Sequence, residues 1–203
     1  MNITKLFETQ AGLDEHIMNE HPELRGQDNL DWKILALQVE LAECANEWCG
    51  FKKWSKDQEP RTNKICHNCK GKGKIFVPQV DSELECGICE STGSLGNPLL
   101  EEYVDCLHFA LSIGLEIGYT EFDEEKMNEY FAQVSEEEQN DITGHFISIN
   151  YITSCMLENE IHYEQAFFEI LSLGERLGFT WEQIEDAYYA KNKVNHERQN
   201  SGY

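Results

Sequence analysis

One predicted helix constrains the fold of this chain more than any other segment. Residues 98–117 read PLLEEYVDCLHFALSIGLEI, and Pro98 stands in the first turn, where proline favours the start of a helix. Apolar side chains cover most of the circumference of this helix instead of forming a single stripe. A helix of this kind is largely buried in a folded protein, so the sequence predicts extensive packing around it.

The other periodic segments of the chain are helical as well. The further segments with helical spacing of apolar residues are 3–20, 32–53, 123–136, 140–172 and 180–196. We expect a break in the fourth of them near residues 158–161. Only KIFVPQV, residues 74–80, has the character of a β-strand. The sequence therefore predicts an all-α helical bundle with a small segment of different character in its middle.

That middle segment, residues 57–97, carries two CxxC pairs. Its cysteines are Cys66, Cys69, Cys86 and Cys89. Two such pairs, in a chain without a secretory signal, predict a Zn²⁺ site rather than disulfides. The motifs CHNCKGKGK and CGICESTGS resemble the zinc modules of DnaJ-type chaperones, at the level of the repeat unit only. We interpret 57–97 as a zinc-ribbon-like insertion into a helical domain formed by 1–56 and 98–203.

The purpose of the predicted zinc site is less specific than its chemistry. Four cysteine ligands leave no open coordination position, so the Zn²⁺ is expected to be structural rather than catalytic. The insertion is then either a staple for a segment without a core of its own or a surface that binds a partner. The remaining cysteines are expected to behave as small buried hydrophobic residues, and they are Cys44, Cys49, Cys106 and Cys155.

Composition and charge exclude several classes of function. The chain of 203 residues has a formal net charge of −22, which disfavours broad binding to nucleic acid or to anionic membranes. No apolar run is long enough to cross a membrane, and the sequence MNITKLFETQ does not have the features of a signal peptide. We therefore expect a cytoplasmic protein without a nucleic-acid or membrane partner.

Two pairs of acidic residues are the strongest indication of chemistry in the helical part. Glu40 and Glu43 share one helix face, and Glu102 and Asp105 share another, in the predicted helix that is otherwise apolar. Buried carboxylates need a partner, and two inward-facing pairs would make an oxygen cage suited to Mg²⁺. The residues alone leave open two solvated acidic faces as the alternative. Glu47 lies one turn further along the same helix face as Glu40 and Glu43. It either takes part in binding the metal or is a charged side chain exposed to solvent.

Longer motifs carry a resemblance to a known family. The segments ELAECANEWCGFKKWS, EEYVDCLHFALSIGLE and YYAKNKVNHERQNSGY occur in this order and together resemble the dimeric, all-α dUTPases, relatives of the MazG-like nucleoside triphosphate pyrophosphohydrolases. The resemblance covers residues 1–56 and 98–203. It implies a homodimer that hydrolyses dUTP to dUMP and pyrophosphate with Mg²⁺. Burial at the dimer interface would also account for the apolar circumference of residues 98–117.

The resemblance also implies roles for particular residues. Glu40, Glu43, Glu102 and Asp105 would bind Mg²⁺, and Glu40 and Glu43 would be catalytic, with Glu40 polarising the attacking water. The implied substrate-binding residues are Gln10, Asp14, Lys53, Trp54, His108, Lys191, Asn195, Arg198 and Tyr203. The motif QAGLD resembles the family element Q-x-x-L-[N/D], and it has Asp14 rather than asparagine at the last position. A carboxylate accepts a hydrogen bond from uracil or from cytosine, so dCTP stays open as a substrate.

Two alternatives to dUTP hydrolysis follow from these observations. The first is the same reaction on dCTP or another deoxynucleoside triphosphate. The second is a catalytically silent, zinc-bearing interaction protein that has kept the fold. The presence of all four acidic positions and of the complete tail motif favours an enzyme over the second alternative.

Overall fold

The computed structural model describes the chain except for residues 1, 80, 120, 133–140, 157–161 and 203. Its helices are α1 (Ile3–Glu20), the 3-10 turn η1 (Pro22–Leu24), α2 (Leu30–Trp48), α3 (Pro98–Glu116), α4 (Glu124–Phe131), α6 (Ile142–Cys155), α7 (His162–Arg176) and α8 (Trp181–Asn200). The strands β1 (Lys74–Val77) and β2 (Ser82–Glu85) form an antiparallel hairpin. The predicted helical class is thereby confirmed.

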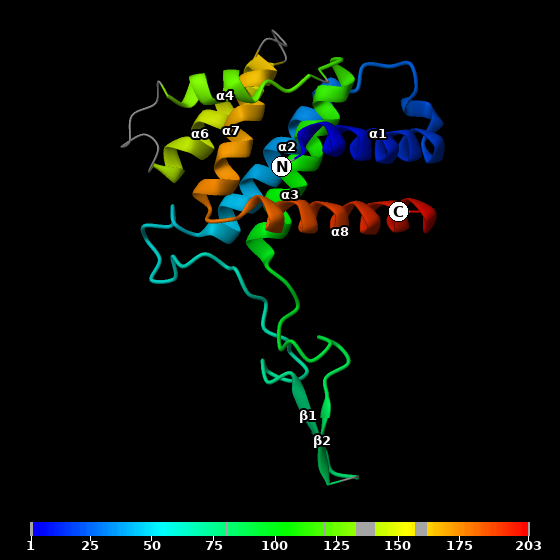
Figure 1. Cartoon of the computed structure of the whole chain (residues 1–203), viewed down its shortest axis with the longest axis vertical. Coiled ribbons are helices and arrows are strands. Elements are labelled where there is room, and N and C mark those ends of the chain that lie inside the picture. The colour runs from blue at the N-terminus through cyan, green and yellow to red at the C-terminus, as the bar shows by residue number, and fades with distance from the viewer. Residues whose placement is uncertain (1, 80, 120, 133–140, 157–161, 203) are drawn as a thin grey trace.

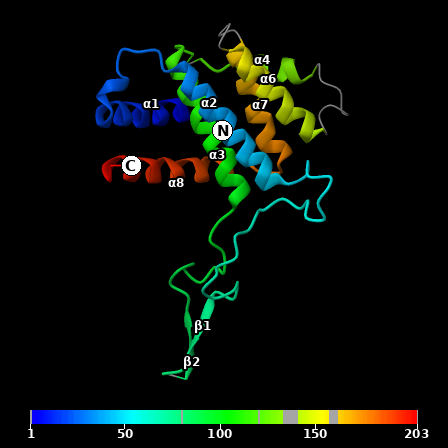
Figure 2. The same ribbon diagram turned by 180° about the vertical axis from the view of Figure 1, so that it is seen from behind.

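The helices form a bundle from which the hairpin projects as an arm. Helix α3 runs through the bundle and packs along α2, with α1 and α8 side by side against one side of it (Figure 1). Helices α4, α6 and α7 form a second group on the other side of α2 and α3 (Figure 2). The arm begins after α2 and returns at the start of α3, so its two roots lie at the ends of the two central helices.

Burial of α3 within its own chain explains its apolar circumference. Tyr103, Leu107 and Leu111 have no solvent exposure, and the Tyr103 hydroxyl donates a hydrogen bond of 3.1 Å to the Ile170 carbonyl. Helices α1, α2, α7 and α8 all pack on α3. The apolar surface of residues 98–117 is therefore used inside one bundle, and it does not indicate a dimer interface.

A buried polar cluster joins the second group of helices. The two oxygens of the Glu169 carboxylate on α7 contact His145 Nδ1 on α6 at 2.8 Å and the Tyr130 hydroxyl on α4 at 2.6 Å. His145 Nε2 lies 2.9 Å from the Glu169 carbonyl oxygen, so both ring nitrogens face acceptors. Burial alone would raise the pKa of Glu169, but its hydrogen bonds to His145 and Tyr130 outweigh burial and hold it below the usual value.

Several elements differ from the sequence-based expectation. Helix α2 ends at Trp48 rather than near Lys53, because Cys49 adopts the left-handed conformation with φ of 62° and caps the helix. The polar segment Ser82–Glu85 forms a second strand, which the sequence did not indicate. Helix α4 ends at Phe131, and residues 133–136 and the break expected at 158–161 lie outside the described residues. Across the described part of the chain, every helix is too short or too polar to cross a membrane.

Candidate active site

Three carboxylates from the two central helices converge at one point. Glu40 comes from α2, and Glu102 and Asp105 come from adjacent turns of α3. One carboxylate oxygen from each of the three lies within 4.8 Å of the others. Glu43 is exposed on α2 and is not part of this group of three, although its charge acts on both glutamates of the group. We call Glu40, Glu102 and Asp105 the acidic cage.

The electrostatics of the cage favour a bound cation. Burial, followed by repulsion from neighbouring carboxylates, raises the pKa of Glu40 and the pKa of Glu102 to about 7. Holding these negatively charged carboxylates close together costs free energy, because they repel one another. A bound divalent cation removes that repulsion. Carboxylate oxygens are also the hard ligands that Mg²⁺ prefers, so the residues fit that ion.

Lys191 already contributes one positive charge to the cage. Its Nζ lies 2.6 Å from Asp105 Oδ2 and 3.1 Å from Glu101 Oε1. Burial would lower the pKa of Lys191, but these two carboxylates outweigh burial and raise it. The C-terminal helix α8 therefore approaches the cage through a charged contact, at the position where the resemblance implies a phosphate-binding lysine.

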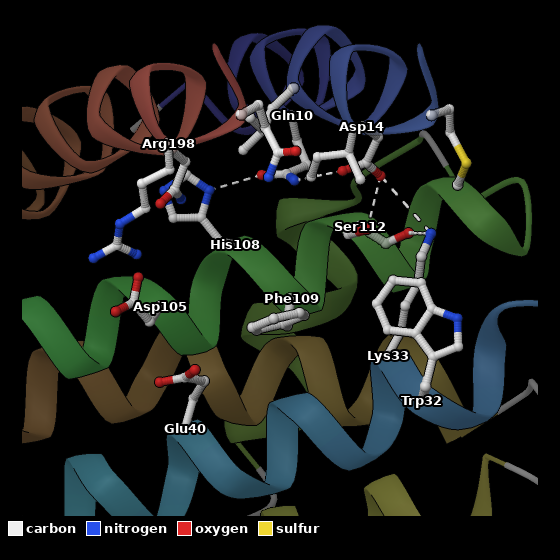
Figure 3. A pocket seen from close by; sticks show the side chains of 15 residues that line it. Gln10, Asp14, Trp32, Lys33, Glu40, Asp105, His108, Phe109, Ser112 and Arg198 are labelled. Carbon is white, nitrogen blue, oxygen red and sulfur yellow. Dashed lines mark hydrogen bonds and ion pairs between the residues drawn. The ribbon is translucent and has the colours of Figure 1, made fainter. Parts of the chain in front are cut away.

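A pocket of about 310 Å³ opens beside the cage between α1, α2, α3 and α8 (Figure 3). It brings together seven residues that the sequence predicted, namely Gln10, Asp14, Glu40, Asp105, His108, Asn195 and Arg198. Trp32, Lys33, Phe109 and Ser112 also line the pocket, and sequence reasoning missed all four. Helical spacing could have found two of them, because Lys33 is seven residues before Glu40 and Ser112 is seven after Asp105.

A hydrogen-bond network fixes the end of the pocket formed by α1. Gln10 Nε2 donates to Asp14 Oδ1 at 2.7 Å, and Gln10 Oε1 accepts from the Tyr188 hydroxyl at 2.9 Å and lies 2.8 Å from His108 Nδ1. The Ser112 hydroxyl donates to Asp14 Oδ2 at 2.7 Å. Both carboxylate oxygens of Asp14 thus accept hydrogen bonds from the protein, which suits Asp14 to holding Gln10 in place.

His108 and Lys33 are buried ionisable groups of the same network. Burial, with a smaller contribution from the charge of Lys191, lowers the pKa of His108 to about 3, so its ring is neutral. Lys33 is 3% exposed, and its Nζ lies 2.6 Å from Glu116 Oε2 and 3.9 Å from Asp14 Oδ2. Burial raises the pKa of Asp14 despite its hydrogen bonds and the charge of Lys33. Lys33 is therefore the cation that balances the two carboxylates at this end of the pocket.

Four predicted substrate residues are not among those that line the pocket, and one of them, Lys191, contacts Asp105 instead. Lys53 and Trp54 follow the end of α2, where the chain turns toward the arm, and neither lines the pocket. The Trp54 side chain is 79% exposed. The tryptophan that does line the pocket is Trp32, at the start of α2. Tyr203 lies outside the described residues.

The arm holds a second candidate metal centre. The four cysteines of the CxxC pairs are buried together, with Cys66 Sγ 3.9 Å from Cys86 Sγ and Cys69 Sγ 3.7 Å from Cys89 Sγ. A tetrahedron with Zn–S bonds of about 2.3 Å separates its sulfur atoms by about 3.8 Å, so the spacing fits Zn²⁺. The backbone N–H groups of Gly73 and Gly93 donate to Cys69 and Cys89, an arrangement that stabilises thiolates.

The comparison with protein families decides the affiliation of the chain. A family model described as dUTPase matches residues 2–69 and 91–203, which is most of the sequence. The chain belongs to the dUTPase family. Enzymes of this kind are dUTP diphosphatases, so the chain is assigned hydrolysis of dUTP to dUMP and pyrophosphate. The comparison with curated proteins found no match.

The matched segments of this dUTPase contain the entire acidic cage and the pocket. They also contain Cys66 and Cys69, whereas Cys86 and Cys89 fall in the unmatched residues 70–90. Both strands of the arm lie in that unmatched segment. The tip of the arm is therefore the part of this dUTPase that the family description does not cover.

Proposed function

We propose that the enzyme hydrolyses dUTP with Mg²⁺ held by Glu40, Glu43, Glu102 and Asp105. The convergence of carboxylate oxygens from α2 and α3 is the observation that carries this proposal. When bound there, Mg²⁺ supplies charge neutralisation for the triphosphate and lowers the barrier to attack by water. Glu43 is the member that would complete the set from the exposed side of α2.

Glu40 is the residue best placed to act on the attacking water. Glu40 and Asp105 both belong to the acidic cage and line the pocket, but Asp105 is ion-paired with Lys191 at 2.6 Å. We propose that the Glu40 carboxylate accepts a proton from the water that attacks the phosphate chain. The phosphate oxygens would be bound by three residues of α8 beside the cage, namely Asn195, Lys191 and Arg198. The amide of Asn195 is a neutral hydrogen-bond donor, the ammonium of Lys191 is a compact positive charge, and the guanidinium of Arg198 offers paired donors.

The α1 end of the pocket would receive the base. Trp32 and Phe109 present aromatic rings to the pocket, and Gln10 keeps one amide hydrogen beyond the bond that it donates to Asp14 (Figure 3). That hydrogen can be donated to a carbonyl oxygen of uracil. His108 Nε2 is buried and has no hydrogen-bond partner within the described part of the chain, so it is a second polar atom that a substrate could satisfy.

Two further features of the enzyme belong to the proposal. We propose that the four-cysteine centre of the arm binds a structural Zn²⁺ that holds the arm together.

We also propose that the enzyme is a homodimer. An apolar surface for the dimer contact is offered by four exposed side chains on α2 and α6, namely Leu35, Val39, Ile147 and Tyr151. These two helices pack on each other, and Gln38 joins them by donating to Ser154 Oγ at 2.8 Å.

Pyrophosphate release from a panel of nucleotides tests the reaction. With Mg²⁺ present, we expect turnover of dUTP, and loss of that turnover in Glu43→Gln. Glu182→Gln, on the exposed first turn of α8, removes one negative charge away from the cage and serves as the matched control. Equal turnover of dCTP would extend the activity to pyrimidine nucleotides. A folded, zinc-loaded protein that turns over none of the nucleotides would overturn the proposal.

A further inference from the structure

A second cavity, of about 630 Å³, lies on the other side of the acidic cage. Glu102 of the cage lines it, together with Glu47 and Glu101 from the same two helices. The opposite wall is formed by residues 60–65, the root of the arm, and it contains Arg61 and Lys64. Glu40 and Asp105 line the first pocket whereas Glu102 lines this cavity, so the cage lies between the two.

The root of the arm is held firmly against the central helices. The Arg61 N–H donates to the Glu47 carbonyl at 2.9 Å, and the Arg61 carbonyl accepts from the Leu99 N–H at 3.1 Å. The Lys64 N–H donates to the Gly96 carbonyl at 3.0 Å, and the Lys64 carbonyl accepts from the Leu95 N–H at 2.7 Å. Backbone hydrogen bonds therefore tie Arg61 to the end of α2 and the start of α3, and tie Lys64 to the returning segment of the arm just before α3.

The charges of the cavity suit a polyanion only because of these two residues. Three carboxylates face the space, and a chain of phosphates would be repelled by them without compensating cations. Arg61 Nη1 lies 3.3 Å from Glu47 Oε1 and 3.3 Å from the Asn46 carbonyl oxygen, and Nη2 lies 4.0 Å from Asp57 Oδ2. The side chain is 45% exposed, and a guanidinium has five N–H donors, so donors remain for a ligand. Lys64 is exposed and has no ion pair within the described part of the chain. Eight of the sixteen lysine and arginine residues of this acidic protein lie between positions 52 and 74.

We propose that Arg61 and Lys64 form a subsite for the β- and γ-phosphates of the substrate and for the pyrophosphate that leaves. The proposal rests on the proposed function and deepens it. The base would occupy the α1 end of the first pocket, the phosphate chain would pass the cage and α8, and the β- and γ-phosphates would extend into the second cavity. A guanidinium offers paired donors to phosphate oxygens, and an ammonium offers a point charge. The insertion thus contributes to the active site in addition to carrying the zinc centre.

Binding of inorganic pyrophosphate in the presence of Mg²⁺, measured by calorimetry, tests the subsite directly. For Arg61→Gln and for Lys64→Met, we expect the dissociation constant to rise roughly tenfold or more, which corresponds to one lost charge-assisted hydrogen bond. Binding of dUMP should be unchanged, because dUMP has neither the β- nor the γ-phosphate. The Michaelis constant for dUTP should rise together with the pyrophosphate dissociation constant.

Two matched variants separate this role from general effects. Lys72→Met removes an exposed lysine from the same arm, outside the cavity, and should leave pyrophosphate binding unchanged. Glu47→Gln breaks the same ion pair as Arg61→Gln but keeps the cation, so pyrophosphate binding should not weaken. Zinc content and helical circular dichroism of each variant should equal those of the wild type.

Several results would overturn the subsite. Unchanged pyrophosphate binding in Arg61→Gln and Lys64→Met would do so, as would an equal loss of dUMP binding in these variants. An equal loss of pyrophosphate affinity in Glu47→Gln would show that the ion pair, and not the cation, matters. Failure of the proposed function is a different observation, because it appears as absence of pyrophosphate release from dUTP by the wild-type enzyme.

Discussion

Replacing Lys33 by methionine should destabilise the enzyme by about 3 kcal/mol. The change keeps the length of the side chain but removes the cation that lies 2.6 Å from Glu116 and 3.9 Å from Asp14. Removing one member of a buried ion pair costs roughly 3–5 kcal/mol, because the other charge stays buried without compensation. The side chains of Asp14 and Glu116 are 16% and 23% exposed, so partial contact with water places the expected cost at the lower end.

The same substitution should weaken substrate binding more than it slows the chemical step. Asp14 holds Gln10 by a hydrogen bond of 2.7 Å, and burial already raises the pKa of Asp14. Without Lys33, the carboxylate of Asp14 gains a proton or turns toward water, and either change loosens Gln10. We therefore expect the Michaelis constant for dUTP to rise roughly tenfold, an amount equivalent to about 1.4 kcal/mol. The turnover number should change less, because Lys33 does not contact the acidic cage.

A double-mutant cycle measures this dependence. Asp14→Asn removes the charge that Lys33 balances, so the double variant should be more stable than the sum of the single effects predicts by at least about 1 kcal/mol. Urea unfolding at constant m-value supplies the free energies. Lys193→Met, at an exposed position of α8, should change the stability by less than about 0.5 kcal/mol. If the effects of Lys33→Met and Asp14→Asn add within about 0.5 kcal/mol, the proposed coupling is wrong.

Three other predictions test separate parts of the structure. Metal analysis should find one Zn²⁺ per chain. Cys86→Ser should lose the Zn²⁺ while the helical circular dichroism of the bundle is retained. Full zinc occupancy in that variant would contradict the assignment of all four cysteines as ligands. Trp32→Ala should raise the Michaelis constant for dUTP more than Trp54→Ala does, since only Trp32 lines the pocket, and the reverse order would contradict the placement of the pocket. Glu169→Gln should destabilise the enzyme by about 2 kcal/mol at neutral pH, because the buried carboxylate that contacts His145 Nδ1 and the Tyr130 hydroxyl is lost. The pKa of Glu169 is lowered from 4.5 in the folded state. The stability difference between wild type and variant should therefore be full above about pH 4.5 and disappear as the pH falls through the lowered pKa. Urea unfolding at several pH values measures this difference, and a pH-independent difference would refute the assignment.

Helical periodicity was sufficient to predict most of the bundle. Helix α1 covers the predicted residues 3–20, and α3 lies within 98–117, because amphipathic and apolar patterns are set by the packing that they produce. The end of α2 could not be predicted in the same way. A cysteine, and not a glycine, adopts the left-handed conformation at position 49, and no local composition marks that choice. The strand Ser82–Glu85 is exposed and polar, so its pairing with β1 leaves no hydrophobic alternation to detect.

The candidate site shows a comparable division between local and tertiary information. Gln10, Glu40, Asp105 and Asn195 meet at one pocket, because each lies on the inner face of its helix; helical spacing pointed to the two carboxylates, and the family resemblance pointed to Gln10 and Asn195. Which tryptophan reaches the pocket depends instead on where α2 begins and ends. The role of Lys33 depends on Glu116, a residue 83 positions away, and such pairs are invisible to a local pattern.

The distribution of the few cations resolves how a protein with a net charge of −22 can act on a triphosphate. Lys33 balances Asp14 and Glu116 at the α1 end of the pocket, Lys191 contacts Asp105 of the acidic cage, and Arg61 lines the second cavity. These cations come from the start of α2, from α8 and from the root of the arm, so only folding brings them to the pocket, the cage and the second cavity. Electrostatic attraction over short distances is strong where water is excluded, whereas the distant acidic surface is screened by salt. Local placement of charge, and not the net charge, therefore determines whether this surface accepts a polyanion.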